Sequence, residues 1–300
     1  MNGVLVVDKP QGLTSHDVVA AARRLLAESR IGHTGTLDPL ATGVLPLAIG
    51  RATRLVRFLT SSDKDYDAVI RFGLTTDSYD VTGTETSRTD AVPREDAVIA
   101  GLRTLNGDYL QVPPAYSAKK IQGRRAYELA RQDREVVLTA VPVHVGRADM
   151  VAFSDGRARV AVTCSAGFYV RSFAHALGEH VGTGACLEAL RRTRSGDFTL
   201  DRALSLEALA DPAQTASRLV PLNALLAGFA AVRVSHRGRE YVAHGRELGV
   251  EDYTAGPQAT PHVASGNPAW IRLLDDQGAL VAVATAGSRP GSLHPSVVLI

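Results

Sequence analysis

One stretch, residues 30–43, limits more than any other how this chain can fold. It reads R-I-G-H-T-G-T-L-D-P-L-A-T-G and contains three glycines, which adopt backbone angles that other residues avoid. Pro39 donates no backbone hydrogen bond and favours an extended conformation at the preceding Asp38. The stretch therefore predicts a shaped loop that presents the Asp38 carboxylate. Because Asp-Pro is also ordinary turn chemistry, a turn-capping Asp38 is the simpler alternative.

Apolar segments on both sides of this loop predict a packed core. Residues 4–7 and 44–49 are apolar runs that indicate buried strands. Residues 65–72 alternate between apolar and polar side chains, which predicts a half-buried strand with Tyr66 on its apolar face. Residues 75–90 and 211–222 lack such periodicity, so we expect a polar loop and a linker there.

Composition and motif spacing exclude several classes of protein. The net charge is only +2, and the two cysteines form no Cys-x-x-Cys pair. No Walker motif and no G-x-G-x-x-G after a strand occurs, and the spacing of His175, Glu179 and His180 fits no zinc motif. No apolar run reaches the length of a signal peptide or a membrane span. We therefore expect a soluble, cytoplasmic protein without a metal, a cofactor or a membrane partner.

Basic residues are concentrated in one segment, residues 113–143. Aromatic side chains are interleaved with them, which suits contact with phosphates and stacking on bases. An exposed basic helix without a ligand is the alternative. The members of this segment are Lys119, Lys120, Arg124, Arg125, Arg131 and Arg134, with Tyr116 and Tyr127 between them.

Several strings together resemble one family of RNA-modifying enzymes. G-H-T-G-T-L-D-P-L-A-T-G resembles the catalytic motif of the TruB family of tRNA pseudouridine synthases. The resemblance spans about residues 3–225. Its further strings are V-D-K-P-Q-G-L-T-S-H-D from residue 7, K-D-Y-D-A-V-I-R-F-G-L-T-T-D-S-Y-D-V-T-G from residue 64, C-S-A-G-F-Y-V-R-S-F-A-H-A-L-G from residue 164 and L-E-A-L-R-R-T-R-S-G from residue 187.

The resemblance implies a catalytic set of three residues. Asp38 would be the nucleophile, Tyr66 would pack on the target base and accept a proton, and Arg171 would pair with Asp38. From the residues alone, Tyr66 could equally be a core aromatic and Arg171 an ordinary structural ion pair. Four further residues take roles by resemblance: Lys9 supports the catalytic loop, His33 fills the space left by a flipped nucleotide, Asp80 pairs with the active-site arginine, and Leu190 lines the base pocket.

The resemblance also implies the architecture. Residues 1–225 would form a mixed α/β catalytic domain with a largely antiparallel central sheet and flanking helices. Segment 113–143 matches an RNA-gripping insertion called the thumb, in which Lys119, Lys120, Arg124 and Arg125 would contact the substrate. Residues 229–300 would form a small β-rich domain of the PUA type, which binds RNA.

The implied reaction is the isomerisation of uridine 55, in the T loop of tRNA, to pseudouridine after base flipping. The enzyme would be a monomer that needs no cofactor and no protein partner. Attack by Asp38 at C1′, attack at C6 and loss of the C2′ proton all stay open. Two other functions compete: the guide-RNA-dependent dyskerin relatives share the aspartate motif but lack the thumb, and a non-catalytic chaperone could fold tRNA without chemistry.

Overall fold

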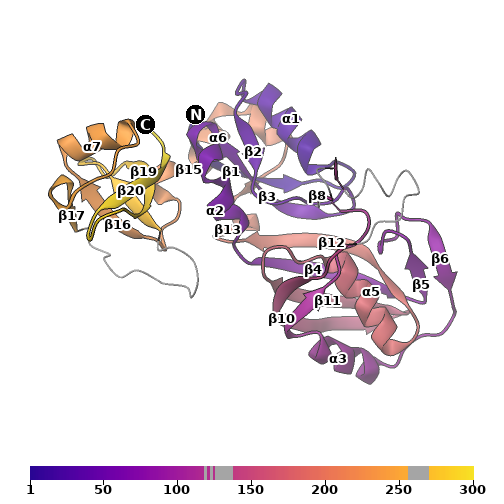
Figure 1. The fold of residues 1–300 in the computed structure, drawn as a ribbon. Helices are drawn as coiled ribbons and strands as arrows, with labels where there is room; N and C mark the ends of the chain where they lie inside the picture. Colours follow the sequence, from indigo (N-terminus) through magenta and orange to yellow (C-terminus); the bar gives the residue numbers. More distant parts are fainter. Residues whose placement is uncertain (118–119, 122–123, 126–137, 256–269) are drawn as a thin grey trace.

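Two β-sheets lie side by side in the computed structural model, which describes residues 1–117, 120–121, 124–125, 138–255 and 270–300 (Figure 1). The larger sheet has eleven described strands. Its main path runs in the order β14 (Ala203–Leu204), β1 (Gly3–Lys9), β3 (Thr42–Ile49), β12 (Ala185–Ser195), β4 (Lys64–Phe72), β11 (Arg157–Cys164), β10 (Val141–Ser154) and β7 (Gly107–Gln111). Three short strands join it at the side: β2 (Ile31–His33), β13 (Phe198–Thr199) and β15 (Val220–Pro221).

Antiparallel pairing dominates the larger sheet, as predicted. The two exceptions among its described pairs are β1 with β14 and β3 with β12, which run parallel. The β3–β12 junction is short, because only Thr42 and Gly43 pair with Arg191 and Arg192 there. On its other side β12 pairs with β4 along almost its whole length. A late strand therefore lies in the middle of the sheet and joins its two halves.

Strand β1 shows why the larger sheet is buried on both faces. Its side chains alternate, as strand geometry requires. Leu5 and Val7 belong to one core, and Val4 and Val6 belong to a second core on the opposite face. The first core lies against helices α1 (Ser15–Leu25), α3 (Glu95–Thr104) and α5 (Val170–Val181), and the second lies against η1 (Gly50–Leu55) and α2 (Val56–Thr60).

Helix α1 begins directly after a capping residue. Thr14 caps it, and the side chains of Thr14 and Asp17 bond each other's backbone N–H in a capping box. No described helix is long and apolar enough to span a membrane. The remaining short helices are η2 (Leu200–Arg202), η3 (Glu207–Ala210), α6 (Pro212–Arg218) and η4 (Leu222–Ala224).

The smaller sheet is built from the C-terminal part of the chain. Its strands run in the order β17 (Tyr253–Ala255), β16 (Ala230–Val234), β18 (Ile271–Leu274), β19 (Leu280–Ala286) and β20 (Leu293–Val298), with α7 (His236–Ala243) and η5 (Val250–Asp252) beside them. Phe58 of α2 packs edge-on against Trp270 and Phe229, with ring centroids at 4.9 and 5.7 Å. The second core therefore continues from the larger sheet into the smaller one.

Two segments differ from the expectations set by their composition. The expected polar loop at residues 75–90 contains a hairpin of β5 (Leu74–Thr76) and β6 (Glu85–Arg88). The expected linker at 211–222 contains α6, because Asp211 caps it and Pro212 occupies its first turn. Both segments pack through a few polar bonds rather than an apolar stripe, so periodicity does not reveal them.

Candidate active site

Asp38 lies in the loop between β2 and β3, and hydrogen bonds hold this loop on both sides. Ser15 Oγ, at the start of α1, accepts a hydrogen bond from Leu37 N (2.7 Å) and donates one to Leu37 O (3.0 Å). Gly12 N donates to Pro39 O at 2.8 Å. The side chain of Asp38 is nevertheless 41% exposed, whereas Leu37 is buried. The loop thus presents the carboxylate, as the Asp-Pro pattern predicts.

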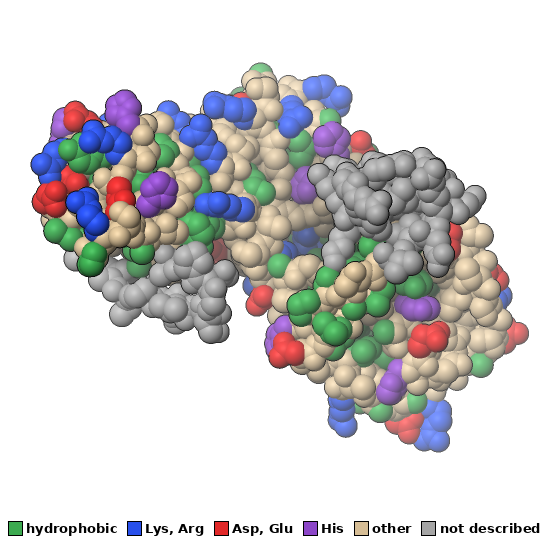
Figure 2. All heavy atoms as spheres, in the orientation of Figure 1, with side chains coloured by type: hydrophobic (Ala, Val, Ile, Leu, Met, Phe, Trp, Pro, Cys, Tyr) green, Lys and Arg blue, Asp and Glu red, His purple; other side chains and the backbone are tan. Residues whose placement is uncertain are grey.

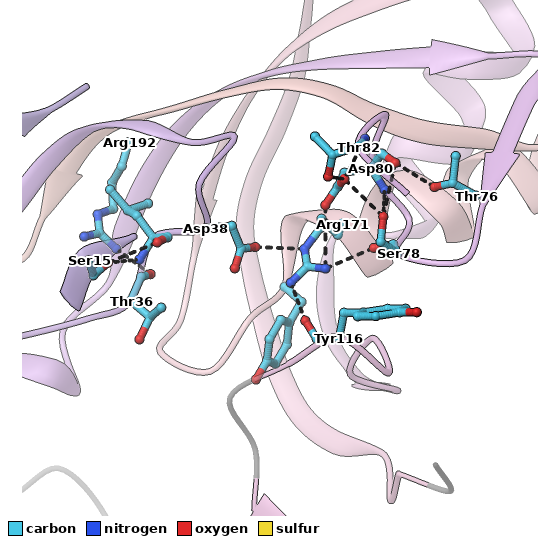
Figure 3. Close-up of polar contacts among 12 residues, drawn as sticks. Ser15, Thr36, Asp38, Thr76, Ser78, Asp80, Thr82, Tyr116, Arg171 and Arg192 are labelled. Atoms are coloured by element: carbon cyan, nitrogen blue, oxygen red, sulfur yellow. Dashed lines mark hydrogen bonds and ion pairs between the residues drawn. The ribbon is translucent and has the colours of Figure 1, made fainter. Parts of the chain in front are cut away.

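Arg171, in the first turn of α5, lies opposite Asp38 (Figure 3). Its Nε is 2.8 Å from Asp38 Oδ2, and its side chain is only 6% exposed. Nη1 donates to Ser78 O at 3.0 Å and Nη2 donates to Tyr116 O at 2.9 Å. Because the guanidinium is held by backbone carbonyls as well, it can orient the carboxylate from a fixed position.

Asp80 lies behind Arg171 and is itself buried. Its Oδ2 is 3.7 Å from Arg171 Nη1, and its Oδ1 accepts hydrogen bonds from Ser78 Oγ (3.1 Å) and Thr82 N (2.9 Å). Thr82 Oγ1 also donates to Oδ1. The two carboxylates, Asp38 and Asp80, therefore share one buried guanidinium. The structure brings these three residues together.

A cavity of about 320 Å³ opens beside Asp38. Tyr66 of β4 and Leu190 of β12 line it, together with Arg171. Apolar and aromatic side chains form part of the remaining wall and polar side chains form the rest, which suits a flat, partly polar ligand. The apolar and aromatic residues of this remaining wall are Leu37, Phe168, Tyr169 and Val170.

Tyr66 is buried, and burial raises its pKa while the nearby Arg192 opposes that shift. A phenol with a raised pKa stays protonated at neutral pH, so it accepts a proton poorly without help from the substrate. Stacking on a base requires no such change in its charge. The position of Tyr66 therefore suits stacking better than the proton-acceptor role.

Lys9 is completely buried below the loop. Its Nζ donates to Pro10 O at 2.9 Å, and burial lowers its pKa to about 8, with Asp38 opposing that shift. The turn that follows Lys9 donates the Gly12 N–H to the catalytic loop. This placement fits a role in supporting the loop better than a solvated surface charge.

The other predicted RNA contacts lie outside this cavity or outside the described part of the chain. His33 ends β2, is half-buried, and is absent from the lining of the cavity among the described residues. Lys119 lies outside the described residues. Lys120 lies in strand β8 (Lys120–Ile121), and Arg124 and Arg125 form β9 (Arg124–Arg125). The backbones of these two short strands pair antiparallel.

Two cavity residues have no specific signal in the sequence: Lys64 and Arg192. Arg192 is 1% exposed and donates to Val44 O at 2.7 Å and to Gly35 O at 3.1 Å, so it holds both ends of the loop that carries Asp38. The spacing K-x-Y in β4 is the one available hint, because residues two apart in a strand share a face. Arg192 stands in a run of basic residues, which composition alone suggests is exposed.

Comparison with known proteins finds the same family over most of the chain. A model described as TruB family pseudouridylate synthase (N terminal domain) matches residues 23–170, and a model described as tRNA pseudouridylate synthase B C-terminal domain matches residues 171–227. The tRNA pseudouridine synthase B of Solibacter usitatus is 41% identical over 303 residues, covering 100% of both chains. That of Mycobacterium tuberculosis is 40% identical over 307 residues, covering 98% of both chains.

Among solved structures, a crystal structure of a Cbf5-Nop10-Gar1 complex has a TM-score of 0.76 and 25% sequence identity. The match covers 99% of this chain and 85% of that one. The similarity therefore extends to the C-terminal sheet, beyond the residues that the family models match. The chain belongs to the TruB family of pseudouridylate synthases.

Proposed function

We propose that this protein converts uridine 55 in the T loop of tRNA to pseudouridine. The observation that carries the proposal is the pair of Asp38 and Arg171, at 2.8 Å, beside a cavity with room for a base. The relatives named tRNA pseudouridine synthase B support tRNA as the substrate. Position 55 rests on the resemblance of the loop motif.

The reaction needs the target uridine outside the RNA stack. Flipping it into the cavity costs a few kcal/mol of lost stacking and pairing, which contacts with the protein must offset. Asp38 then attacks C1′, and the electron pair of the C1′–N1 bond remains on the base. The detached base turns over, C5 attacks C1′, and the Asp38 carboxylate leaves. The C5 proton is lost and N1 gains one, so no atom enters or leaves overall.

Each of the surrounding residues has one task in this proposal. Arg171 keeps the Asp38 carboxylate ionised and oriented, and Asp80 fixes Arg171 from behind. Tyr66 stacks on the base, and Leu190 of the neighbouring strand also lines the base pocket. Lys9 supports the loop from below, and His33 occupies the space that the flipped nucleotide leaves.

Binding of the RNA would use surfaces on both sides of the cavity. On the face shown in Figure 2, basic side chains gather on the region around α1 and α6, and on the C-terminal part they are mixed with acidic ones. The C-terminal part would act as the PUA-type module. The thumb segment, 113–143, begins beside the site, since Tyr116 O accepts a bond from Arg171. A chain with its own thumb would act as a monomer, without a guide RNA or a protein partner.

The proposal is tested by a pseudouridine assay on an unmodified tRNA transcript, with the purified protein and no cofactor. We expect product at the T-loop uridine, no turnover by Asp38→Asn, and tRNA affinity of this variant close to wild type. Asp149→Asn makes the same chemical change at an exposed position of β10, paired with Arg147, and should leave turnover unchanged. Wild-type turnover by Asp38→Asn would remove Asp38 as the nucleophile. Tight tRNA binding without any product would favour the chaperone or a missing guide.

A further inference from the structure

Three basic side chains are buried in β1, β4 and β12, and none of them has a carboxylate within 4.0 Å among the described residues. Lys9 is 0% exposed, Lys64 is 6% exposed and Arg192 is 1% exposed. A buried charge without a counter-charge is costly, and such groups gather at functional sites. Asp38, which faces Lys9, already pairs with Arg171. The acid that faces Lys64 is Asp63, with which it forms no described ion pair. The cluster thus carries positive charge that the protein itself leaves unbalanced.

The geometry of the sheet places two of these charges, those of Lys64 and Arg192, in the lining of the cavity. Lys64 and Tyr66 are two residues apart in β4, so both point to the same face. Arg192 of β12 lies directly across from Tyr66 in the register of the two strands. Lys64, Tyr66 and Arg192 all line the cavity.

Lys64 lines the cavity, whereas Lys9 is absent from its lining among the described residues, and the ammonium group of Lys64 keeps one donor to spare. Arg192 is committed to the carbonyls of Val44 and Gly35. Lys64 Nζ donates to Thr60 O and Ser62 O. An ammonium group has three donors, so one N–H of Lys64 is left without a described acceptor. Thr60 also lines the cavity, which places the anchored ammonium in its wall.

Composition makes a lysine at this position unusual for this chain. Only four of the 33 basic residues are lysines, and all the others are arginines. Lysine differs from arginine in its compact, concentrated charge, which suits a single-atom contact in a small space. Burial, and next the charge of Arg192, lower the pKa of Lys64 to about 8, which still leaves it mostly protonated at neutral pH.

The cavity itself indicates which anion could balance this charge. Its wall includes Tyr66, Phe168 and Leu190, which suit a flat base better than a phosphate. A bound uracil is neutral, but it becomes an anion when the C1′–N1 bond breaks and its electron pair stays on the ring. That charge spreads over N1, O2 and O4. Loss of the C2′ proton also leaves the pair on the base, and attack at C6 places charge on O4.

We propose that Lys64 is a catalytic residue whose ammonium group stabilises the negative charge on the uracil ring while the base is detached from the ribose. The inference rests on the proposed function. Lys64 forms no covalent bond and transfers no proton in this role. It acts as a preorganised charge, and such groups are most effective once a bound base excludes water from the site.

The test is the single-turnover rate of Lys64→Ala on a tRNA transcript, followed by chemical rescue. We expect the rate constant to fall about 100-fold, a typical loss for one preorganised donor, with tRNA affinity unchanged within about twofold. Added n-propylammonium, which can fill the vacated space with a charged amine, should restore the rate in proportion to its concentration. Neutral 1-propanol, of similar shape, should not.

Control variants separate charge from packing. Arg159→Met removes one positive charge from the neighbouring β11, where Arg159 is exposed and pairs with Asp67, and should keep the wild-type rate. Lys64→Arg should be faster than Lys64→Met by at least about tenfold, because only the former keeps the charge. The comparison of Lys64→Arg with Lys64→Met still tests the role of the charge if Lys64→Ala does not fold.

Three outcomes would overturn the inference: an unchanged rate for Lys64→Ala, equal rescue by 1-propanol and n-propylammonium, or no rescue together with equal rates for Lys64→Arg and Lys64→Met. In each case the wild-type protein still forms pseudouridine. If the wild-type protein forms none, the proposed function fails and the inference fails with it. The two failures are therefore distinguishable in one experiment.

Discussion

The lowered pKa of Lys64 makes the folding stability of the protein depend on pH. Lys64 is faced by Arg192, Cys164 and Asp63, and its pKa of about 8 lies below the usual 10.5. Between these two values the unfolded chain binds a proton that the folded protein has released. Folding stability should therefore rise with pH across this window, and the contribution of Lys64 should be fully unfavourable below about pH 8.

Lys64→Met makes this linkage measurable. The free energy of unfolding of wild type, relative to that of the variant, should increase by roughly 2–3 kcal/mol between pH 7 and pH 10.5. Lys9 has a similarly lowered pKa in both proteins, so its contribution cancels in the difference. Urea denaturation at several pH values provides the measurement. Parallel stability curves would mean that the ammonium of Lys64 is solvated in the folded state.

Two neighbouring arginines, Arg191 and Arg192, differ in burial in a way that the sequence does not predict. Arg191 pairs with Asp8 at 2.7 Å and is 41% exposed, whereas Arg192, the next residue, is buried and bonds backbone carbonyls. The sequence predicts Asp38 and Arg171 through motifs that name them individually. It cannot choose between two adjacent arginines, because that choice depends on which face of β12 meets the loop.

At the scale of elements, the end of the catalytic loop depends on one close approach. Gly43 has φ +98°, and a Cβ atom there would lie 2.2 Å from Arg192 O. Gly12 has a similar φ of +91°, but its added Cβ would meet nothing within 4 Å. The two positions therefore share a backbone conformation and differ in the space available.

Gly43→Ala and Gly12→Ala form a matched pair. Gly12→Ala should lose about 1–2 kcal/mol of unfolding free energy from the left-handed backbone alone. Gly43→Ala should lose about 1–3 kcal/mol more, because the methyl group pushes β3 away from β12. Denaturant unfolding measures both losses, and the pseudouridine assay should show the larger loss of rate for Gly43→Ala. Equal losses would indicate that the β3–β12 junction yields easily.

Elements with strong periodicity are predictable from this sequence, and elements formed by polar contacts are not. The alternation at residues 65–72 corresponds to β4, and the apolar run at 44–49 lies within β3. The β5–β6 hairpin and α6 carry no comparable pattern. The hairpin matters to the site, because its turn holds Asp80 against Arg171.

At the scale of the whole molecule, the contact between the two sheets has its own spectroscopic reporter. Trp270 is the single tryptophan of the chain, and it packs on Phe58 while Arg57 lies 4.9 Å from its ring centroid. Arg54 also donates to Val298 O across this contact. Because Arg54 bonds and Arg57 stacks at this contact, neither side chain is fully available to RNA.

Phe58→Ala should weaken the contact between the sheets. We expect a loss of about 3 kcal/mol, a red shift of the native tryptophan emission, and earlier unfolding of the C-terminal sheet. Phe153→Ala makes the same truncation on β10, where Phe153 packs against Phe72, and should lower stability without moving the emission. Fluorescence and circular dichroism, recorded in the same urea titration, compare the two. A single coincident transition with unshifted emission in Phe58→Ala would show that the two sheets remain docked without this ring.

The position of β12 between β3 and β4 has a consequence for folding during synthesis on the ribosome. The ribosome delivers both neighbours long before residues 185–195, so the nascent chain carries two half-sheets with open edges. Asp38 is synthesised early, but its loop lacks the hydrogen bonds from Arg192 until β12 has been synthesised. Arg192, which is synthesised late, therefore completes the surroundings of Asp38, which is synthesised early. An incomplete chain, released too soon, has the acid but no pocket in which to use it.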